Sequence, residues 1–317
     1  MKILGIGGLL TLSVLLSPYQ TFGVELTVAE RAESKKIALT LPIADLHDHD
    51  GYAPKLGKET GVVWSGSGGK KGGRTSWYQL KEEFGDKRIG WAGQAEFNKA
   101  YLYRSGGMSE MLDFDNFGDL YEETKKDLKA GLIVGIGEIF INNLHSNRQV
   151  RMQRKGQVDA PVFRKFFDLL AKYDGWLGFH MEADLDSMDE LGKLLAYNRK
   201  GRVLWNHCGT NSTTSKVRSM LDKHPNLFCE FSFRFPPVNK KPARNIFTRD
   251  GIDPSWRALM ESHSDRFMVG TDAHNEKQFF GAIKTIRKGL LPNLKPETAR
   301  KVAYQNAQRL FKLKGKP

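Results

Sequence analysis

The chain has 317 residues, of which 40% are hydrophobic and 27% are charged. This composition is that of a globular protein with a sizeable core, and it excludes a fibrous or low-complexity chain. The net charge of +13 favours acidic partners such as phosphates, carboxylates or nucleic acid. Because the lysines are scattered without a dense block, a charged, solvated surface explains the excess better, and we do not expect nucleic acid as a partner.

The first residues predict a secretory signal peptide. Lys2 is followed by the uncharged apolar run Ile3–Ser17 and then by the small residues Thr21 and Gly23. This order is typical of a signal peptide, here residues 1–23. The alternative, an uncleaved membrane anchor, is weaker because the run falls short of the ~20 apolar residues that span a bilayer. We therefore expect an exported protein, periplasmic or secreted, with no membrane span in its mature form.

Short apolar, β-branched or aromatic runs recur along the chain, and such runs suit strands that are buried on both faces. The predicted strands are Ile43–Leu46, Gly61–Trp64, Arg88–Ala92, Leu132–Ile139, Trp176–Met181, Val203–His207, Leu227–Phe233 and Phe267–Asp272. Helical periodicity separates the later runs, and one helix begins with a predicted capping box of Ser187 and Glu190. This alternation over ~250 residues predicts an α/β fold, a single-domain (β/α)8 TIM barrel at residues 24–317.

Two features of the predicted barrel leave alternatives open. The stretch from Tyr52 to Trp77 is rich in Gly, Lys and Ser. It is either a long loop over the barrel mouth or a region where the second and third strands are misplaced. Cys208 and Cys229 both lie in apolar, strand-like segments. An oxidising compartment permits a disulfide between them, and buried free thiols are at least as well supported.

Functional side chains of such a barrel lie where strands end and βα loops begin. Six polar residues occupy these positions: His47, His49, Glu138, His180, His207 and Asp272. Residues two apart on a strand face the same side, so His47 and His49 can bind one ion. Imidazole and carboxylate donors suit zinc, manganese or iron. Singly, each has a structural alternative: a histidine can be a hydrogen-bonded core residue, Asp272 an N-cap and Glu138 a cap or an ion-pair partner.

The ordered set resembles the amidohydrolase superfamily, in particular its amidohydrolase-related branch. The matching segments are "GIGEI", "FHMEAD", "VLWNHCG", "NLFCEFSF" and "DRFMVGTD". The resemblance implies that His47, His49 and Asp272 hold one divalent metal, that His180 and His207 hold a second, and that Glu138 bridges them. Many members have a carbamylated lysine at the bridging position, and the glutamate here is similar to TatD-type enzymes. Zinc is the expected metal, manganese or iron stay open, and so does the number of ions, one or two.

The resemblance implies a metal-dependent hydrolase that uses a metal-activated water to cleave a small ester, lactone, amide or phosphoester. Asp272 would accept the proton of that water, and His207 would help to polarise the substrate oxygen. One alternative is a metal-dependent decarboxylase of a small aromatic acid, which generally needs one metal and no bridging carboxylate. A second is a TatD-like nuclease, which export disfavours. A third is a barrel that only binds a ligand, although no expected metal ligand is missing.

Further residues are candidates for contact with a small-molecule substrate. Glu182 and His274 each lie two residues beyond a proposed ligand and can face the same pocket, although loop positions are equally expected. Arg234 follows the seventh predicted strand and would bind an anionic substrate, unless it forms a structural ion pair. Asp45 shares the face of His47 and would either orient an imidazole or form a core hydrogen bond. A homo-oligomer remains open, and the sequence does not identify the substrate.

Overall fold

The computed structural model describes residues 25–49, 52–66, 73–97, 114–145, 153–232, 246–248 and 251–315. The predicted signal peptide and Arg234 lie outside these residues. Within them the protein is an α/β fold built on parallel sheets. None of the helices in these ranges has the length and apolar character needed to cross a membrane.

Parallel strands make up the centre of the fold. They are β1 (Ile43–Asp45), β2 (Val62–Gly66), β3 (Arg88–Ile89), β4 (Trp91–Gly93), β5 (Gly135–Asn142), β6 (Trp176–Met181), β7 (Arg202–Asn206), β8 (Leu227–Phe231) and β11 (Phe267–Val269). One sheet has the order β1-β2-β3 and the other the order β11-β8-β7-β6-β5-β4. A short antiparallel pair, β9 (Phe247–Thr248) and β10 (Gly251–Ile252), lies outside these sheets.

The two sheets meet at both ends, so the strands follow one another around a ring. Only Gly90 separates β3 from β4. At the other junction the backbone N–H of Leu46 donates to the carbonyl of Val269 at 3.0 Å, and Asp48 forms a parallel bridge with Ala273. These contacts place β1 beside β11, which brings the start and the end of the chain's strand series together.

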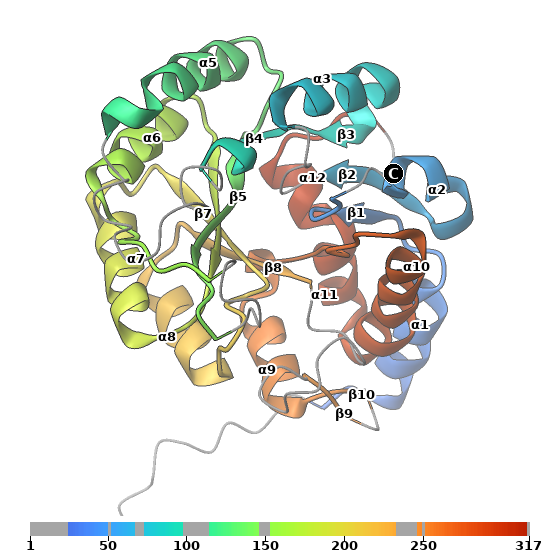
Figure 1. Ribbon diagram of the computed structural model, residues 1–317. Helices are drawn as coiled ribbons and strands as arrows, with labels where there is room; N and C mark the ends of the chain where they lie inside the picture. Colours follow the sequence, from blue (N-terminus) through green and yellow to red (C-terminus); the bar gives the residue numbers. More distant parts are fainter. Residues whose placement is uncertain are drawn as a thin grey trace, which may run out of the picture.

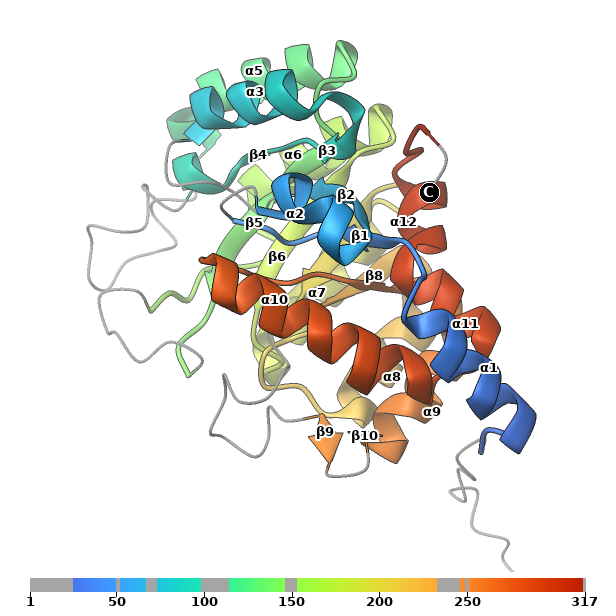
Figure 2. The ribbon, with the colours of Figure 1, turned by 90° about the vertical axis from the view of Figure 1, so that its right-hand side faces the viewer.

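Helices surround the ring of strands (Figure 1). The view turned by 90° about the vertical axis also shows helices outside the strands (Figure 2). They are α1 (Val28–Ala38), α2 (Tyr52–Thr60), α3 (Gly73–Phe84), α5 (Gly118–Lys129), α6 (Pro161–Lys172), α7 (Leu185–Tyr197), α8 (Thr214–Lys223), α9 (Pro254–Ser262), α10 (Glu276–Thr285), α11 (Pro296–Arg300) and α12 (Asn306–Leu310). Two π-helical turns, Ile286–Leu290 and Lys301–Gln305, continue α10 and join α11 to α12.

All of the predicted strands are present, with shifted edges. The third is interrupted at Gly90, and the fourth begins at Gly135 and continues to Asn142. The interpretation of Tyr52–Trp77 as one long loop is wrong, because α2, β2 and the start of α3 lie within it. Cys208 and Cys229 are buried, and their Sγ atoms lie 2.7 Å apart without a disulfide.

The predicted Ser187–Glu190 capping box is wrong. The N-cap of α7 is Asp184, three residues before Ser187, and its carboxylate accepts a hydrogen bond from the backbone N–H of Ser187. Glu190 instead accepts from the backbone N–H of Val158 at 2.9 Å. Ser187 and Asp184 can each cap a helix, and tertiary contacts decided that Asp184 does so.

Asp45 joins the end of β1 to the segment after β11. Its Oδ1 accepts hydrogen bonds from the backbone N–H groups of Thr271 (2.9 Å) and His47 (3.1 Å), and its Oδ2 accepts from the Thr271 hydroxyl at 2.7 Å. All three contacts are buried, so the core hydrogen-bond alternative describes Asp45. This clamp sets the position of the two chain segments that carry His47 and Asp272.

A core mutation tests the packing between α6 and the strands. Phe163 is fully buried, and its ring lies 5.4 Å from that of Phe97 and 5.2 Å from that of Phe179. Phe163→Ala should lower the free energy of unfolding by about 3–5 kcal/mol, measured by urea denaturation. The control Val28→Ala, at a side chain 89% exposed, should change it by less than about 0.5 kcal/mol. Equal effects of the two substitutions would contradict the described core.

Candidate metal centre

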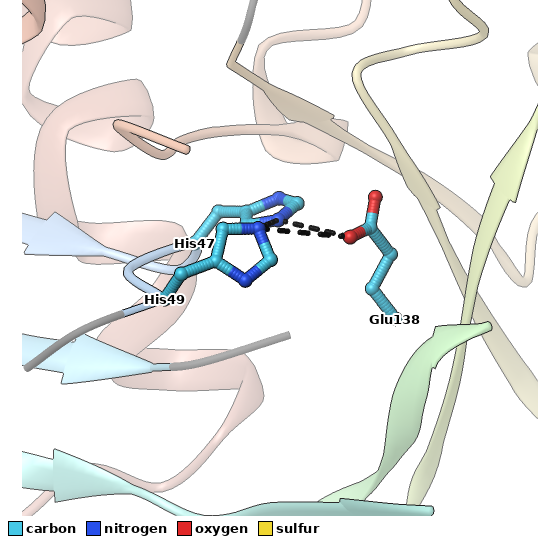
Figure 3. A group of neighbouring side chains, drawn as sticks. All are labelled: His47, His49 and Glu138. Carbon is cyan, nitrogen blue, oxygen red and sulfur yellow. Dashed lines mark hydrogen bonds and ion pairs between the residues drawn. The ribbon is translucent and has the colours of Figure 1, made fainter. Parts of the chain in front are cut away.

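Four donor atoms converge from the segments just after β1 and β11 and from the middle of β5, so the prediction that Glu138 ends its strand is wrong. The Nε2 atoms of His47 and His49 are 3.1 Å apart, and Asp272 Oδ1 lies 3.4 Å from the first and 2.8 Å from the second. Glu138 Oε2 approaches from the other side, 3.2 Å from His47 Nε2 and 3.9 Å from His49 Nε2. Figure 3 shows the two imidazoles and the carboxylate pointing toward one another. These atoms form the first donor group.

A second donor group uses the other oxygen of the same carboxylate. Glu138 Oε1 lies 2.7 Å from His180 Nδ1 and 2.8 Å from His207 Nε2, and the two imidazole nitrogens are 3.1 Å apart. Glu138 is 2% exposed, so its carboxylate has little access to water. One glutamate therefore faces two clusters of histidine at once.

The backbone brings these side chains together by turning sharply at the strand ends. His207 and Asp272 have φ angles of 57° and 51°, in the left-handed region that non-glycine residues rarely occupy. Such conformations persist where the surrounding structure holds them, and they concentrate at functional sites. Gly137 is needed before Glu138, because its φ is 152° and a Cβ there would lie 2.9 Å from the Cα of Gly178.

The donors fit a divalent metal. Ligands about 2.0–2.1 Å from a tetrahedral zinc ion lie about 3.3 Å from one another, and the contacts of the first group, 2.8 to 3.9 Å, bracket that spacing. Nitrogen and carboxylate oxygen are the donor types that zinc, manganese and iron accept. A cation within each group would also account for the pair of imidazole nitrogens that face each other at 3.1 Å there. The expected residues therefore fit such an ion.

The pKa values in the first donor group are shifted by burial and by the charges of neighbouring group members. Burial alone would lower the pKa of His47, but the charges of Glu138 and Asp272 outweigh it and raise the pKa of His47 well above its usual value. Burial likewise opposes ionisation of the acids. The charges of His47 and His180 nevertheless hold the pKa of Glu138 well below its usual range, and the charge of His47 with the hydrogen bond from His49 lowers the pKa of Asp272.

The histidines at the edges of the centre differ from one another. Burial lowers the pKa of His180, although the charge of Glu138 acts in the opposite direction. His274 stacks on His49 with ring centroids 4.3 Å apart and an interplanar angle of 12°. Its side chain is 59% exposed, and its Nε2 lies 3.8 Å from Asp272 Oδ1. His274 therefore lies at the solvent side of the first donor group.

The other predicted residues have different positions. Glu182 is buried. One of its oxygens accepts from the backbone N–H of His145 and the other contacts His145 Nδ1, both at 2.8 Å, and these contacts fix the turn after β5. Substrate contact by Glu182 stays a prediction. Asp48 accepts from Ser65 Oγ at 2.9 Å and pairs with the buried Arg88.

Three residues that contact the donor groups escaped the sequence interpretation. Glu230, on β8, contacts Nδ1 of His47, and Ser232 contacts Nδ1 of His207. Gln94 Nε2 donates to Glu138 Oε2 at 3.3 Å. One signal was visible for Glu230. It is an acidic residue inside the apolar run "LFCEF", whose residues are all buried, and such a residue needs polar partners.

The sequence profile described as amidohydrolase matches residues 107–313. This match covers more than half of the chain, and the chain belongs to the amidohydrolase family. It is accordingly an enzyme, and its donor groups agree with the metal dependence of that family. No protein with curated function matches the chain in sequence.

Solved structures with low sequence identity share the fold. An uncharacterized TIM-barrel protein from Bordetella bronchiseptica is similar over 89% of this chain and 90% of its own, with TM-score 0.54 and 11% identity. A 2,6-dihydroxybenzoate decarboxylase from Rhizobium covers 86% and 90%, with TM-score 0.50 and 15% identity. A dihydroorotase from Campylobacter jejuni covers 88% and 84%, with TM-score 0.50 and 11% identity.

The lowered carboxylate pKa values predict the acid sensitivity of the metal-free protein. The ionised forms of Glu138 and Asp272 stabilise the fold fully above the usual carboxylate range, about pH 4. Their stabilisation is lost as the pH falls, because the unfolded chain takes up protons first. Urea unfolding from about pH 6 to pH 3 should show a slope that Glu138→Gln reduces by up to about 1.4 kcal/mol per pH unit. Identical slopes would show that the Glu138 charge does not contribute.

Proposed function

We propose that the protein is a metal-dependent hydrolase with two divalent metal ions. Zinc is the expected metal, and Glu138 would bridge the two ions. The observation that carries the proposal is the position of the Glu138 carboxylate, with Oε2 in the first donor group and Oε1 in the second. His47, His49 and Asp272 would complete one site, and His180 and His207 the other. The sites lie at one end of the ring of parallel strands, where such folds carry their chemistry.

The chain's own residues supply proton transfer and orientation. A bound divalent metal lowers the pKa of water towards about 7 and polarises a carbonyl or phosphoryl oxygen. Asp272 accepts the proton of the attacking water on Oδ2, because Oδ1 faces His49 at 2.8 Å, and then delivers it to the leaving group. His207 would help to polarise the substrate oxygen through the metal that its Nε2 would hold. His274, at the solvent side, contacts the substrate together with Glu182 or Arg234, and Arg234 would favour an anionic one.

The substrate class in this proposal is a small ester, lactone, amide or phosphoester. A decarboxylase of a small aromatic acid is the second candidate, and the observation that favours it is the fold shared with the 2,6-dihydroxybenzoate decarboxylase. The bridging position of Glu138 favours hydrolysis, because a decarboxylase of this kind generally needs one metal. A TatD-like nuclease is the third candidate and rests on the glutamate and the positive charge.

We also propose that residues 24–317 form one (β/α)8 barrel that is exported after loss of residues 1–23. The ring of parallel strands supports the barrel if β3 and β4 count as one interrupted strand. The apolar run Ile3–Ser17 supports export. N-terminal sequencing of the protein recovered from the host's periplasm or medium should begin near residue 24, and an intact N-terminus in the cytoplasm would contradict export.

Metal content distinguishes the two leading functions. The purified mature protein should bind about two equivalents of zinc or manganese, because the two donor groups lie on opposite oxygens of Glu138. His180→Ala should reduce this to about one equivalent, measured by elemental analysis after dialysis. His263→Ala, at a histidine that pairs with Asp222 outside the centre, is the matched control and should keep both. One equivalent in the unmodified protein would favour the decarboxylase, and no recruitment of metal would contradict both functions.

The proton-transfer role is tested by Asp272→Asn, which keeps the shape of the side chain and removes its basicity. We expect turnover of whichever ester, lactone, amide or phosphoester proves reactive to fall by about 10²–10⁴-fold. Asp265→Asn, at an exposed carboxylate paired with Lys301, should leave turnover unchanged. If Asp272→Asn retains both its metal and full turnover, another residue moves the proton.

A further inference from the structure

Glu230 lies behind the metal centre, on the far side of His47 from the donor atoms. It comes from β8, is 0% exposed, and its Oε2 is 3.0 Å from His47 Nδ1. The opposite nitrogen of the same ring, Nε2, faces Glu138 and Asp272. The imidazole of His47 therefore connects Glu230 to the first donor group.

Ser232 extends this connection to the second donor group. Its hydroxyl donates to Glu230 Oε2 at 3.0 Å, and its oxygen lies 2.9 Å from His207 Nδ1. Because the hydroxyl proton is directed at Glu230, the serine oxygen must accept from His207, which places a proton on His207 Nδ1. Glu230 Oε2 has only acceptor capacity, so His47 must likewise carry its proton on Nδ1.

The surrounding chain holds the Glu230 carboxylate in one orientation. Asn206 Nδ2 and the backbone N–H of His207 both approach Oε2 at 3.4 Å, so the hydrogen bonds that the described residues make to this carboxylate converge on one oxygen. The other oxygen lies against Gly270, where any Cβ would collide with it and would lie 2.6 Å from the Cβ of His47. Glycine at position 270 thus leaves the space that Glu230 and His47 share.

We propose that Glu230 is a positioning residue that, with Ser232, keeps the protons of His47 and His207 on Nδ1, so that both Nε2 atoms present lone pairs to the metals. The proposal rests on the metal centre of the proposed function and assigns a role to a residue outside the donor groups. A neutral imidazole carries its proton on either nitrogen, and the hydrogen bond made by one nitrogen decides which nitrogen is left to bind a metal. Because one oxygen serves both rings, Glu230 prepares both halves of the centre together.

The proton positions can be measured without any metal. In the full-length mature chain freed of metal with a chelator, and at a pH high enough to leave both imidazoles neutral, histidine ¹⁵N shifts distinguish the Nδ1–H form from the Nε2–H form. His47→Gln and His207→Gln assign the signals. Both histidines should be in the Nδ1–H form in the unmodified protein. Glu230→Met, which keeps the length of the side chain and removes the acceptor, should shift His47 toward the Nε2–H form. An unchanged His47 in Glu230→Met would overturn the proposal.

Zinc affinity supplies the second readout, measured by competition with a chromophoric chelator. Glu230→Met should weaken binding by about 10–100-fold, the usual effect of losing such an outer contact. Glu230→Gln can place its amide oxygen where Oε2 lies, so it should retain the Nδ1–H form and bind within a few-fold of the unmodified protein. A Glu230→Gln variant that loses as much affinity as Glu230→Met would refute orientation as the role.

Two further variants separate positioning from general stability. Glu261→Met removes a carboxylate on α9 that accepts from the backbone N–H of Lys295 at 2.7 Å and from Thr298 Oγ1 at 2.6 Å. It should leave zinc affinity and proton positions unchanged. Ser232→Ala removes only a hydroxyl and should shift His207 while His47 keeps its proton on Nδ1, which tests the proposal even if Glu230→Met does not fold. If the unmodified protein binds no zinc, the proposed function fails, and the proton positions still decide the role of Glu230.

Discussion

The Glu138 carboxylate, buried between two groups of histidines, is the interaction on which the centre depends. A buried carboxylate is strongly unfavourable unless charges or hydrogen bonds compensate it. Here the neighbouring imidazoles supply that compensation, and they hold the pKa of Glu138 well below its usual range despite burial. The same carboxylate in turn raises the pKa of His47. The groups are stable only as a set, which explains why several strand ends must meet at one place.

The fold meets this demand through contacts at the junction of its first and last strands. Asp45 accepts hydrogen bonds from Thr271 and from the backbone of His47, so the neighbouring segments that carry His47 and Asp272 are held together where β1 lies beside β11. Behind them, Glu230 and Ser232 contact the outward-facing nitrogens of His47 and His207. Inner donors and outer hydrogen bonds therefore form two layers. Orientation of metal ligands in known sites depends on such outer contacts as much as on the ligands themselves.

Much of the architecture was predictable because it depends on local pattern. Continuous apolar runs gave the strands their positions, and the polar residue at the end of each run identified the donors, since strand periodicity determines which side chains face the same way. The errors arose where two local solutions compete. Ser187 and Asp184 can each cap a helix, and Asp184 does so, held by hydrogen bonds from Asn142 and Lys155 while the Ser187 hydroxyl accepts from Asn142. Gly-rich sequence in Tyr52–Trp77 concealed α2 and α3.

The amino-acid sequence by itself determined the donor types, their order along the strands and the family to which the chain belongs, because these follow from residue identity and spacing. Only the tertiary structure decided that the two oxygens of Glu138 face different donor groups, and that Glu230 contacts His47 across 183 positions of sequence. The physical reason is that a carboxylate inside an apolar strand looks the same in sequence whatever its partner. Its partner is selected by which strands lie side by side in the ring.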